Sequence, residues 1–170
     1  MTDDPLFQQE YEKALRIATE AHEGQKDKSG MDYILHPIAV SGYCVTPAGR
    51  IAALLHDVVE DTHVTLGDLR AAGFSEDIVT AVDCVSKREG EAVGDYLARV
   101  ATSDIAAEVK FADMRHNGTR WPAGRPEGEA EANYHKYNSR ARTLLRLVGP
   151  ERAARLMTAG TYEWVAGGRV

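Results

Sequence analysis

The stretch Ile51-Ala-Ala-Leu-Leu-His-Asp-Val-Val-Glu60 sets one imidazole and one carboxylate, His56 and Asp57, in an apolar frame. Its apolar residues predict a helix that is buried on most of its circumference. An imidazole and a carboxylate lose hydration there, which costs free energy unless other groups replace the water. A divalent metal ion can replace it, because neutral imidazole and ionised carboxylate are both common ligands. A His–Asp hydrogen bond that satisfies a buried core is the alternative, and the pair alone does not decide between the two.

The composition bounds the class of protein. The 170 residues suit one domain with a single core, or one domain with a small C-terminal appendage. The net charge of −6 argues against non-specific nucleic-acid binding, although a local basic pocket can still receive a small anion. No apolar run reaches the length of a membrane span, and the acidic N-terminal segment does not resemble a signal peptide. We therefore expect a cytoplasmic protein, with Cys44 and Cys84 as reduced core residues.

Helical periodicity predicts an all-α fold. Apolar residues recur at three- and four-residue steps over residues 5–23, and again from Tyr134 to Val148, where Gly149-Pro150 ends the pattern. Another helix is expected to start near His36-Pro37, and strict alternation typical of strands is absent. Candidate helix N-caps are Thr46, Thr65, Ser75 and Ser103.

The organisation predicted from these patterns is a single domain over residues 1–170. A core that holds the metal should span about 10–120, and C-terminal helices should span about 133–166. Between them, about 122–132 is predicted to be a mobile loop, because it is rich in glycine, proline and acidic residues. Gly24 to Asp32 is a second polar loop.

Four candidate metal ligands lie on different predicted elements: His36, His56, Asp57 and Asp113. Two imidazoles and two carboxylates form a mixed nitrogen and oxygen site, which suits Mn²⁺, Fe²⁺ or Zn²⁺ better than a metal that selects thiolates. A metal bound there would lower the pKa of a water ligand and make hydroxide available near neutral pH.

Glu60 and Asp61 are candidate catalytic residues. On a continuous helix each lies four residues after one member of the His56-Asp57 pair, so both side chains would face the same site. A carboxylate there can orient a water, take its proton or protonate a leaving group. The alternative is a solvated acidic turn, which the helix dipole disfavours at a C-terminus.

Several polar residues are candidate substrate contacts. Lys28 and Ser29 could offer an ammonium and a hydroxyl to a phosphate, although an exposed loop without a ligand is the simpler explanation for this segment taken alone. Asn117 is either a substrate contact or a helix C-cap. Tyr137 is included as a substrate contact, with a core position as the alternative.

Taken together, these residues resemble the HD superfamily of metal-dependent phosphohydrolases, in particular the RelA/SpoT-type alarmone hydrolases and their small stand-alone relatives. The block around His56 is the most specific part of the resemblance, since both its apolar frame and its acidic end agree. The matching segments are Ala21-His-Glu-Gly-Gln25, Lys28-Ser-Gly30, Tyr33-Ile-Leu-His-Pro37, Ala52-Ala-Leu-Leu-His-Asp-Val-Val-Glu-Asp-Thr62, Val109-Lys-Phe-Ala-Asp113 and His116-Asn117.

The resemblance implies an HD-domain helical bundle that hydrolyses the 3′-pyrophosphate of guanosine tetra- or pentaphosphate, (p)ppGpp, and releases pyrophosphate with GDP or GTP. It implies a small nucleotide as substrate, and no segment resembles the family's synthetase domain. The net charge and the lack of a long apolar run predict no nucleic-acid or membrane partner, and a homo-oligomer is possible. By resemblance, the metal, usually Mn²⁺, is held by His36, His56, Asp57 and Asp113, the catalytic acids are Glu60 and Asp61, and the nucleotide contacts include Lys28, Ser29 and Asn117.

Two departures bear on the substrate. Asp27 stands where the family usually places an arginine near the nucleotide, and Gly118-Thr-Arg-Trp121 differs from the usual continuation. An acidic residue near a polyphosphate is expected to weaken binding by like-charge repulsion. Two alternatives therefore stay open: hydrolysis of another phosphorylated nucleotide or cofactor, and a nucleotide-binding protein without turnover. The Glu60-Asp61 pair speaks against the second, because a sensor does not need it.

Overall fold

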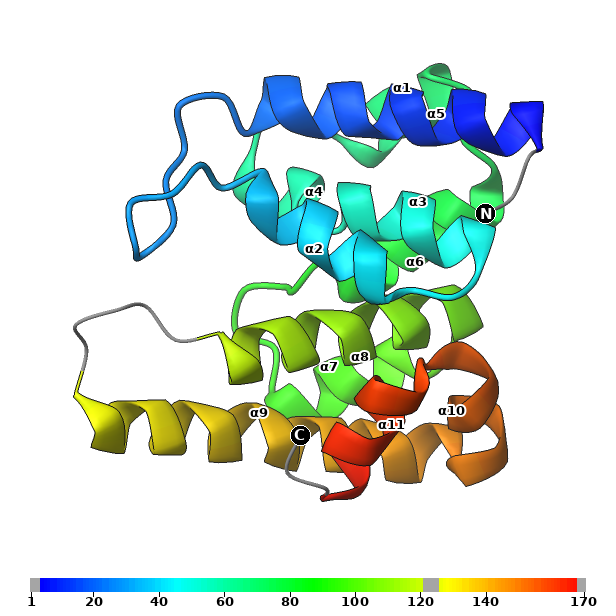
Figure 1. The fold of residues 1–170 in the computed structure, drawn as a ribbon. Coiled ribbons are helices and arrows are strands. Elements are labelled where there is room, and N and C mark those ends of the chain that lie inside the picture. The colour runs from blue at the N-terminus through cyan, green and yellow to red at the C-terminus, as the bar shows by residue number, and fades with distance from the viewer. Residues whose placement is uncertain (1–3, 121–125, 168–170) are drawn as a thin grey trace.

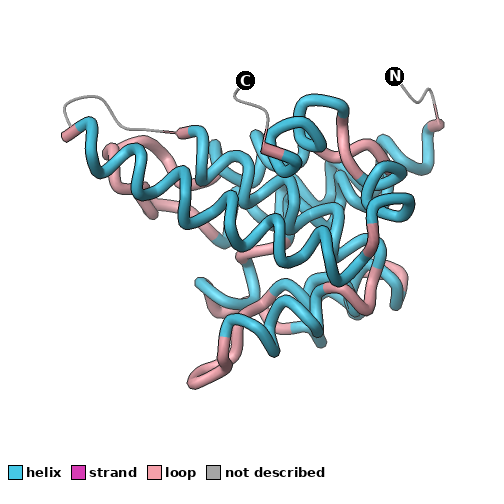
Figure 2. Tube along the Cα trace, turned by 90° about the horizontal axis from the view of Figure 1, so that it is seen from below, coloured by secondary structure: helices cyan, strands magenta, loops and turns pink. Residues whose placement is uncertain are grey.

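The computed structural model describes residues 4–120 and 126–167, and these residues form helices and loops without a strand (Figure 1). The all-α prediction is confirmed, and the tube in Figure 2 shows helix after helix joined by short loops. The helices are α1 (Pro5–Ala21), α2 (Leu35–Tyr43), α3 (Pro47–Leu55), α4 (Val58–Asp61), α5 (Leu66–Ala71), α6 (Glu76–Val85), α7 (Val93–Val100), α8 (Asp104–Thr119), α9 (Glu127–Val148), α10 (Pro150–Leu156) and α11 (Ala159–Ala166).

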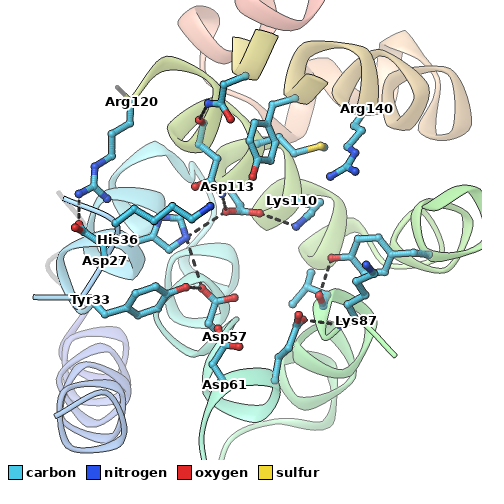
Figure 3. A pocket seen from close by; sticks show the side chains of 18 of the residues that line it. Asp27, Tyr33, His36, Asp57, Asp61, Lys87, Lys110, Asp113, Arg120 and Arg140 are labelled. Atoms are coloured by element: carbon cyan, nitrogen blue, oxygen red, sulfur yellow. Dashed lines mark hydrogen bonds and ion pairs between the residues drawn. The ribbon is translucent and has the colours of Figure 1, made fainter. Parts of the chain in front are cut away.

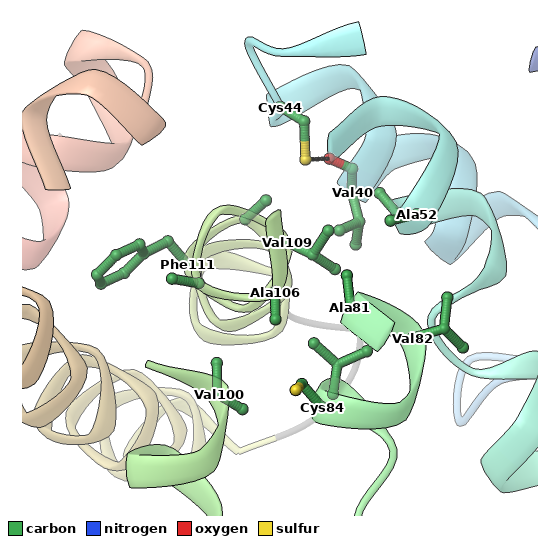
Figure 4. Packing of buried hydrophobic residues seen from close by; sticks show 14 of the residues in the cluster. Val40, Cys44, Ala52, Ala81, Val82, Cys84, Val100, Ala106, Val109 and Phe111 are labelled. Carbon is green, nitrogen blue, oxygen red and sulfur yellow. Dashed lines mark hydrogen bonds between the residues drawn. The ribbon is translucent and has the colours of Figure 1, made fainter. Parts of the chain in front are cut away.

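Helix α8 lies at the centre of the molecule. It packs against α2, α3 and α6 on one side and against α9, α10 and α11 on the other (Figure 1). Its apolar side chains point in several directions around the helix axis, with Val109 facing α2 and α3 while Phe111 faces away from them (Figure 4). A helix that is covered all round needs no polar face, so the polar residues buried on α8 require a specific explanation.

The predicted helix starts are confirmed. Thr46 caps α3 by accepting a hydrogen bond from the Gly49 amide, and Ser75 and Ser103 cap α6 and α8 in the same way. Thr65 and Asp68 form the reciprocal capping box.

The expectation of one helix that carries His56 and Asp57 is wrong. Helix α3 ends at Leu55, and α4 begins at Val58, so that His56 and Asp57 form the junction. Asp57 is the N-cap of α4, a position that aspartate favours, but its carboxylate does not cap the helix. Instead Asp57 Oδ2 accepts a hydrogen bond from the Tyr33 hydroxyl and lies against the two buried imidazoles, so side-chain contacts elsewhere account for the break.

The predicted mobile loop is also too long. Residues 127–132 belong to the first turns of α9, whereas 121–125 lie outside the described residues. The acidic residues that suggested a loop are well placed at a helix N-terminus, where the macrodipole favours negative charge. Pro126 precedes the helix directly and marks its start.

Two smaller expectations can be compared with the structure. Cys44 and Cys84 are both buried and unpaired, as predicted. Among the described helices, none combines the length and the apolar character needed to cross a membrane.

Glu108 joins the two halves of the fold. Its side chain is 1% exposed on α8, and its Oε1 accepts hydrogen bonds from the backbone amides of Val45 (2.5 Å) and Thr46 (2.8 Å). Its Oε2 accepts from the Thr46 hydroxyl. These bonds tie the connection between α2 and α3 to α8. Burial raises the pKa of Glu108, and the hydrogen bonds from Thr46 and Val45 offset only part of that effect.

Glu108→Ala should lower the free energy of unfolding by roughly 2–4 kcal/mol, because two partly buried amides and the Thr46 hydroxyl lose their acceptor. Glu108→Gln keeps an acceptor oxygen and should cost less. Since the folded protein holds the Glu108 proton to higher pH than the unfolded chain does, the stability of the wild type relative to Glu108→Gln should fall as pH rises above about 4. Urea denaturation of all three proteins at several pH values measures this, and a pH-independent difference would contradict it.

Candidate functional site

A pocket of about 560 Å³ opens beside α8, between the loop that follows α1 and helix α9 (Figure 3). His36, Asp57 and Asp113 line its base, and Glu60 and Asp61 line it from α4. Cationic side chains also line it: Lys26, Lys28, Lys87, Lys110, Arg120 and Arg140. A concave site with several cations on a chain of net charge −6 is suited to a small polyanion.

The structure brings together the four predicted metal ligands. His36 comes from α2, His56 and Asp57 from the junction of α3 and α4, and Asp113 from α8. Asp57 Oδ2 lies 2.9 Å from His56 Nε2 and 3.5 Å from His36 Nε2. Asp113 Oδ1 lies 3.2 Å from His36 Nε2 and 3.8 Å from His56 Nε2. Both carboxylates therefore approach both imidazoles through the same ring nitrogen.

Hydrogen bonds at the other ring nitrogens orient the two imidazoles. His56 Nδ1 lies 2.8 Å from the Ala53 carbonyl oxygen and must donate to it, which leaves Nε2 to face the carboxylates. His36 Nδ1 lies 2.8 Å from His116 Nδ1. Burial, together with the nearby His36 and Arg120, lowers the pKa of His116 to about 4, so a neutral His116 accepts from His36. This pattern of outer hydrogen bonds is the one that metal-bound histidines usually show.

His56 Nε2 is buried and, among the residues that the structure describes, has no partner in hydrogen-bonding geometry, even though Asp57 Oδ2 is close. Burial favours a neutral ring, but Asp57 and Asp113 outweigh it and raise the pKa of His56 to about 9. The two carboxylates thus favour a positive charge next to His56 Nε2, but a proton on Nε2 would have no well-aligned acceptor. A metal ion would satisfy both conditions.

The spacing of these atoms suits one shared cation. Ligands about 2.1 Å from an ion lie roughly 3 Å apart at right angles and roughly 4.2 Å apart when opposite. The four nitrogen–oxygen distances, from 2.9 to 3.8 Å, fall within that range. The ligand atoms of His36, His56 and Asp57 all lie within 4.8 Å of one another, and Asp113 adds two further carboxylate contacts, one to each imidazole.

Three further side chains position the carboxylates. The Tyr33 hydroxyl donates to Asp57 Oδ2 at 2.7 Å, and Lys110 Nζ donates to Asp113 Oδ2 at 2.6 Å. Asn117 Nδ2 donates to Asp113 Oδ1 at 2.5 Å, so this candidate substrate contact is also a partner of the cluster. Sequence analysis did not single out Tyr33 or Lys110. Each lies three residues before a predicted ligand, a spacing that places Lys110 and Asp113 on one face of α8.

Glu60 and Asp61 reach the pocket from the short helix α4 and not, as expected, from a continuation of α3. Glu60 Oε2 accepts a hydrogen bond from the Lys87 amide at 2.7 Å, which fixes the side chain. Desolvation in the concave site raises the pKa of both carboxyl groups, and the neighbouring Asp57 raises it further. Both are thereby better placed to exchange protons near neutral pH.

The loop after α1 brings Lys28 and Ser29 to the pocket, as predicted, together with Asp27. Asp27 Oδ2 forms an ion pair with Arg120, and burial is outweighed by hydrogen bonds from Ser29 and Arg120, which hold the pKa of Asp27 well below its usual range. The negative charge expected to repel a polyphosphate is therefore compensated by Arg120.

Tyr137 lines the pocket from α9 and is half-buried, so it is more than a core residue. Asn133 and Arg140 also line the pocket, and sequence analysis missed both. They lie four residues before and three residues after Tyr137, on the same helix face, which is the pattern that could have revealed them.

The pocket's cations divide into two groups. Lys26 pairs with Asp32, Lys110 with Asp113 and Arg120 with Asp27. Within residues 4–120 and 126–167, no ion pair engages the other three: Lys28, Lys87 and Arg140. The second group therefore keeps its charge for a ligand.

Several known proteins are similar to this chain in sequence. A GTP pyrophosphokinase of Streptomyces coelicolor is 37% identical over 119 residues, which cover 62% of this chain and 14% of that protein. A guanosine-3′,5′-bis(diphosphate) 3′-pyrophosphohydrolase of Borreliella burgdorferi is 34% identical over 122 residues, 63% of this chain and 18% of that protein. The bifunctional (p)ppGpp synthase/hydrolase SpoT of Escherichia coli is 32% identical over 132 residues, 68% of this chain and 18% of that protein. This chain thus spans less than a fifth of the length of these relatives.

The fold has a counterpart among solved structures. A metazoan ortholog of SpoT, described as hydrolysing ppGpp, superposes with a TM-score of 0.67 at 24% identity and covers 92% of both chains. The family profile of the HD domain matches residues 14–116, which include all four residues of the imidazole and carboxylate cluster. The chain therefore belongs to the HD domain family.

Proposed function

We propose that this protein is a metal-dependent phosphohydrolase that removes the 3′-pyrophosphate of (p)ppGpp and releases pyrophosphate with GDP or GTP. The observation that carries the proposal is the buried cluster of His36, His56, Asp57 and Asp113 at the base of a pocket lined by cations. The names of the relatives from Borreliella burgdorferi and Escherichia coli support the choice of substrate.

The metal would be held by His36, His56, Asp57 and Asp113, and Mn²⁺ is the ion we propose. Two nitrogen and two oxygen donors suit Mn²⁺, with room left in an octahedral shell. When bound, such an ion supplies Lewis-acid stabilisation of phosphate charge and makes hydroxide available near neutral pH. Tyr33, Lys110 and Asn117 would keep the two carboxylates aligned.

Glu60 and Asp61 would handle the protons of the reaction. The Glu60 carboxylate, fixed through Oε2 by the Lys87 amide, keeps Oε1 to orient the attacking water and take its proton. As the water oxygen bonds to the phosphorus, the bond from that phosphorus to the ribose 3′-oxygen breaks, and Asp61, with its raised pKa, would give the 3′-oxygen a proton. This division of roles follows from the constraint on Glu60, which makes it the better positioned of the two.

The unpaired cations would bind the phosphates. Lys87 and Arg140 face the pocket from the side opposite the loop after α1 (Figure 3), and Lys28 offers a further donor from the loop. Ser29 beside it also lines the pocket, with its amide and hydroxyl donating to Asp27. Charge-assisted hydrogen bonds from such groups are about twice as strong as neutral ones. Tyr137 presents an aromatic ring for contact with the nucleoside, and Asn117, which donates to Asp113, also lines the pocket.

A second candidate substrate is another phosphorylated nucleotide or cofactor. Asp27, compensated by Arg120, stands in place of the arginine that the family usually has there, and this change lies in the pocket wall. The proton and metal chemistry would be the same for either substrate. A nucleotide-binding protein without turnover is the remaining alternative, and the first assay below separates all three.

The wild type, supplied with Mn²⁺, should convert ppGpp to GDP and pyrophosphate, as followed by ion-exchange chromatography. Glu60→Gln should retain the metal and lose the rate by ~10²–10⁴-fold, typical of removing an acid–base group. If only another nucleotide from a small panel is hydrolysed, that nucleotide replaces ppGpp as the proposed substrate and the proposed reaction type stands. Metal binding without turnover of any panel member would favour the non-catalytic alternative, and an unchanged rate in Glu60→Gln would reject its role.

Asp57→Ala should abolish stoichiometric Mn²⁺ binding, because it removes the carboxylate that lies closest to His56 Nε2. Asp95→Ala is the matched control, since it removes an exposed carboxylate from the first turn of α7. Titration of Mn²⁺ followed by electron paramagnetic resonance measures both variants, and circular dichroism checks their folding. Equal Mn²⁺ binding by the wild type and a folded Asp57→Ala protein would contradict the ligand assignment.

Arg140→Met should raise KM for ppGpp by ~10–100-fold with little change in Mn²⁺ affinity, since the loss of one hydrogen bond to a charged group costs about 1.5–3 kcal/mol. Arg146→Met is the control: it removes an exposed arginine from the same helix, outside the pocket. Steady-state kinetics over a range of ppGpp concentrations give the answer. If the two variants have the same KM, Arg140 does not bind the substrate.

A further inference from the structure

Arg120 crosses from the end of α8 to the loop that follows α1. It is the C-cap residue of α8, and its backbone amide donates to the His116 carbonyl oxygen. Its Nη2 forms the ion pair with Asp27 Oδ2 and lies 3.1 Å from the Ser29 hydroxyl oxygen. Asp27, Ser29 and Arg120 all line the pocket (Figure 3), so this bridge forms part of the pocket wall.

Asp27 is fixed on its other side by the loop itself. Its Oδ1 accepts hydrogen bonds from the Ser29 amide (2.7 Å), the Ser29 hydroxyl (2.6 Å) and the Met31 amide (3.1 Å). The Asp27 side chain is 10% exposed, whereas that of Arg120 is 32% exposed. Asp27 is thus a rigid anchor, and the guanidinium it holds still presents part of its surface to the pocket.

Only one nitrogen of the Arg120 guanidinium, Nη2, makes contacts with the loop. Both contacts, to Asp27 and to Ser29, are made through Nη2. Within the described part of the chain, no hydrogen bond engages Nε or Nη1 of Arg120. A planar guanidinium held in this way offers N–H donors along one edge and a flat face for stacking.

Charge distinguishes this wall of the pocket from the opposite one. The Asp27–Arg120 pair is neutral, as is the neighbouring Lys26–Asp32 pair, so that among the described residues of this wall Lys28 alone carries an uncompensated positive charge, and it is exposed. Lys87 and Arg140 lie across the pocket without an ion pair in the described residues (Figure 3). The phosphates of a nucleotide are attracted to the uncompensated charges. The neutral Asp27–Arg120 pair, with its planar guanidinium, is then left to contact the uncharged base.

We propose that Arg120 is a specificity-determining residue that binds the nucleobase, through its planar face and its free N–H donors, and that Asp27 is its positioning residue. The inference rests on the proposed function in one respect, namely that the ligand is a nucleotide. In this chain the guanidinium comes from position 120 and is anchored by the acid at position 27. Guanine suits it, because its carbonyl oxygen accepts from an arginine and its bicyclic ring stacks on one.

Titration calorimetry with two nucleotides, the 3′,5′-bis(diphosphates) of guanosine and uridine, tests the inference with Mn²⁺ present and Glu60→Gln as the background that blocks turnover. Arg120→Ala should weaken binding of the guanosine compound by ~10-fold or more, as expected for loss of a stacking partner, and affect the uridine compound much less. Equal losses for both nucleotides would overturn the inference, because they would indicate a phosphate contact or a purely structural bridge.

Asp27→Asn is the matched variant. It keeps the oxygen that accepts from Ser29 and Met31 and replaces Oδ2, which holds Arg120, with an amide nitrogen. If Asp27 only positions Arg120, this variant should weaken binding of the guanosine compound clearly less than Arg120→Ala does, because the guanidinium is still present. If the pair only latches the loop onto α8, the two substitutions break the same contact and should weaken binding equally, which would overturn the inference.

The result is separable from that of the proposed function. If the wild type hydrolyses neither compound but binds the guanosine compound selectively through Arg120, the proposed hydrolase function is rejected and this inference is supported. If the wild type hydrolyses ppGpp but Arg120→Ala weakens binding of the guanosine and uridine compounds equally, the proposed hydrolase function is supported and this inference is rejected. If neither nucleotide binds, both proposals are wrong.

Discussion

Two carboxylates, Asp57 and Asp113, lie together in the buried end of the pocket, and the need to balance their charge governs the structure around them. Burial alone would raise the pKa of Asp113, but Lys110, His36 and His56 outweigh it and hold that pKa well below its usual value. For Asp57 the imidazole of His56 has the same effect. Both carboxylates are therefore ionised, and the surrounding helices have to deliver positive charge or hydrogen-bond donors to them.

This requirement explains features that local sequence preference does not. The chain interrupts an apolar helical stretch at His56 and Asp57, which brings both side chains to one point. Helix α8 runs through the centre although it carries Asp113, Glu108 and Lys110, because each of these has a defined partner: the imidazoles, the loop before α3 and Asp113. Packing and charge balance are thus met by the same helix.

Most of the fold could be predicted from the sequence, because helix starts depend on neighbouring residues: Thr46, Thr65, Ser75 and Ser103 cap helices as their local patterns indicated. The candidate ligands could be found because His and Asp are unusual in apolar surroundings. The break in the helix after Leu55 could not be predicted, because the Asp57 carboxylate is held by Tyr33 and the imidazoles from elsewhere in the chain. Arg120 and Arg140 were missed for the same reason, since one bridges to a distant loop and the other reaches the pocket only when α9 packs on α8.

The four residues of the cluster come from α2, from the α3–α4 junction and from α8, and no short segment contains more than the adjacent pair His56 and Asp57. An unfolded chain would offer an ion only scattered, weak ligands, whereas the folded chain offers them all at once. A cation bound there would thus act as a reversible cross-link between three parts of the chain, and its concentration would enter the folding equilibrium directly. The cell's supply of that ion would then influence how long the protein persists as well as how fast it works.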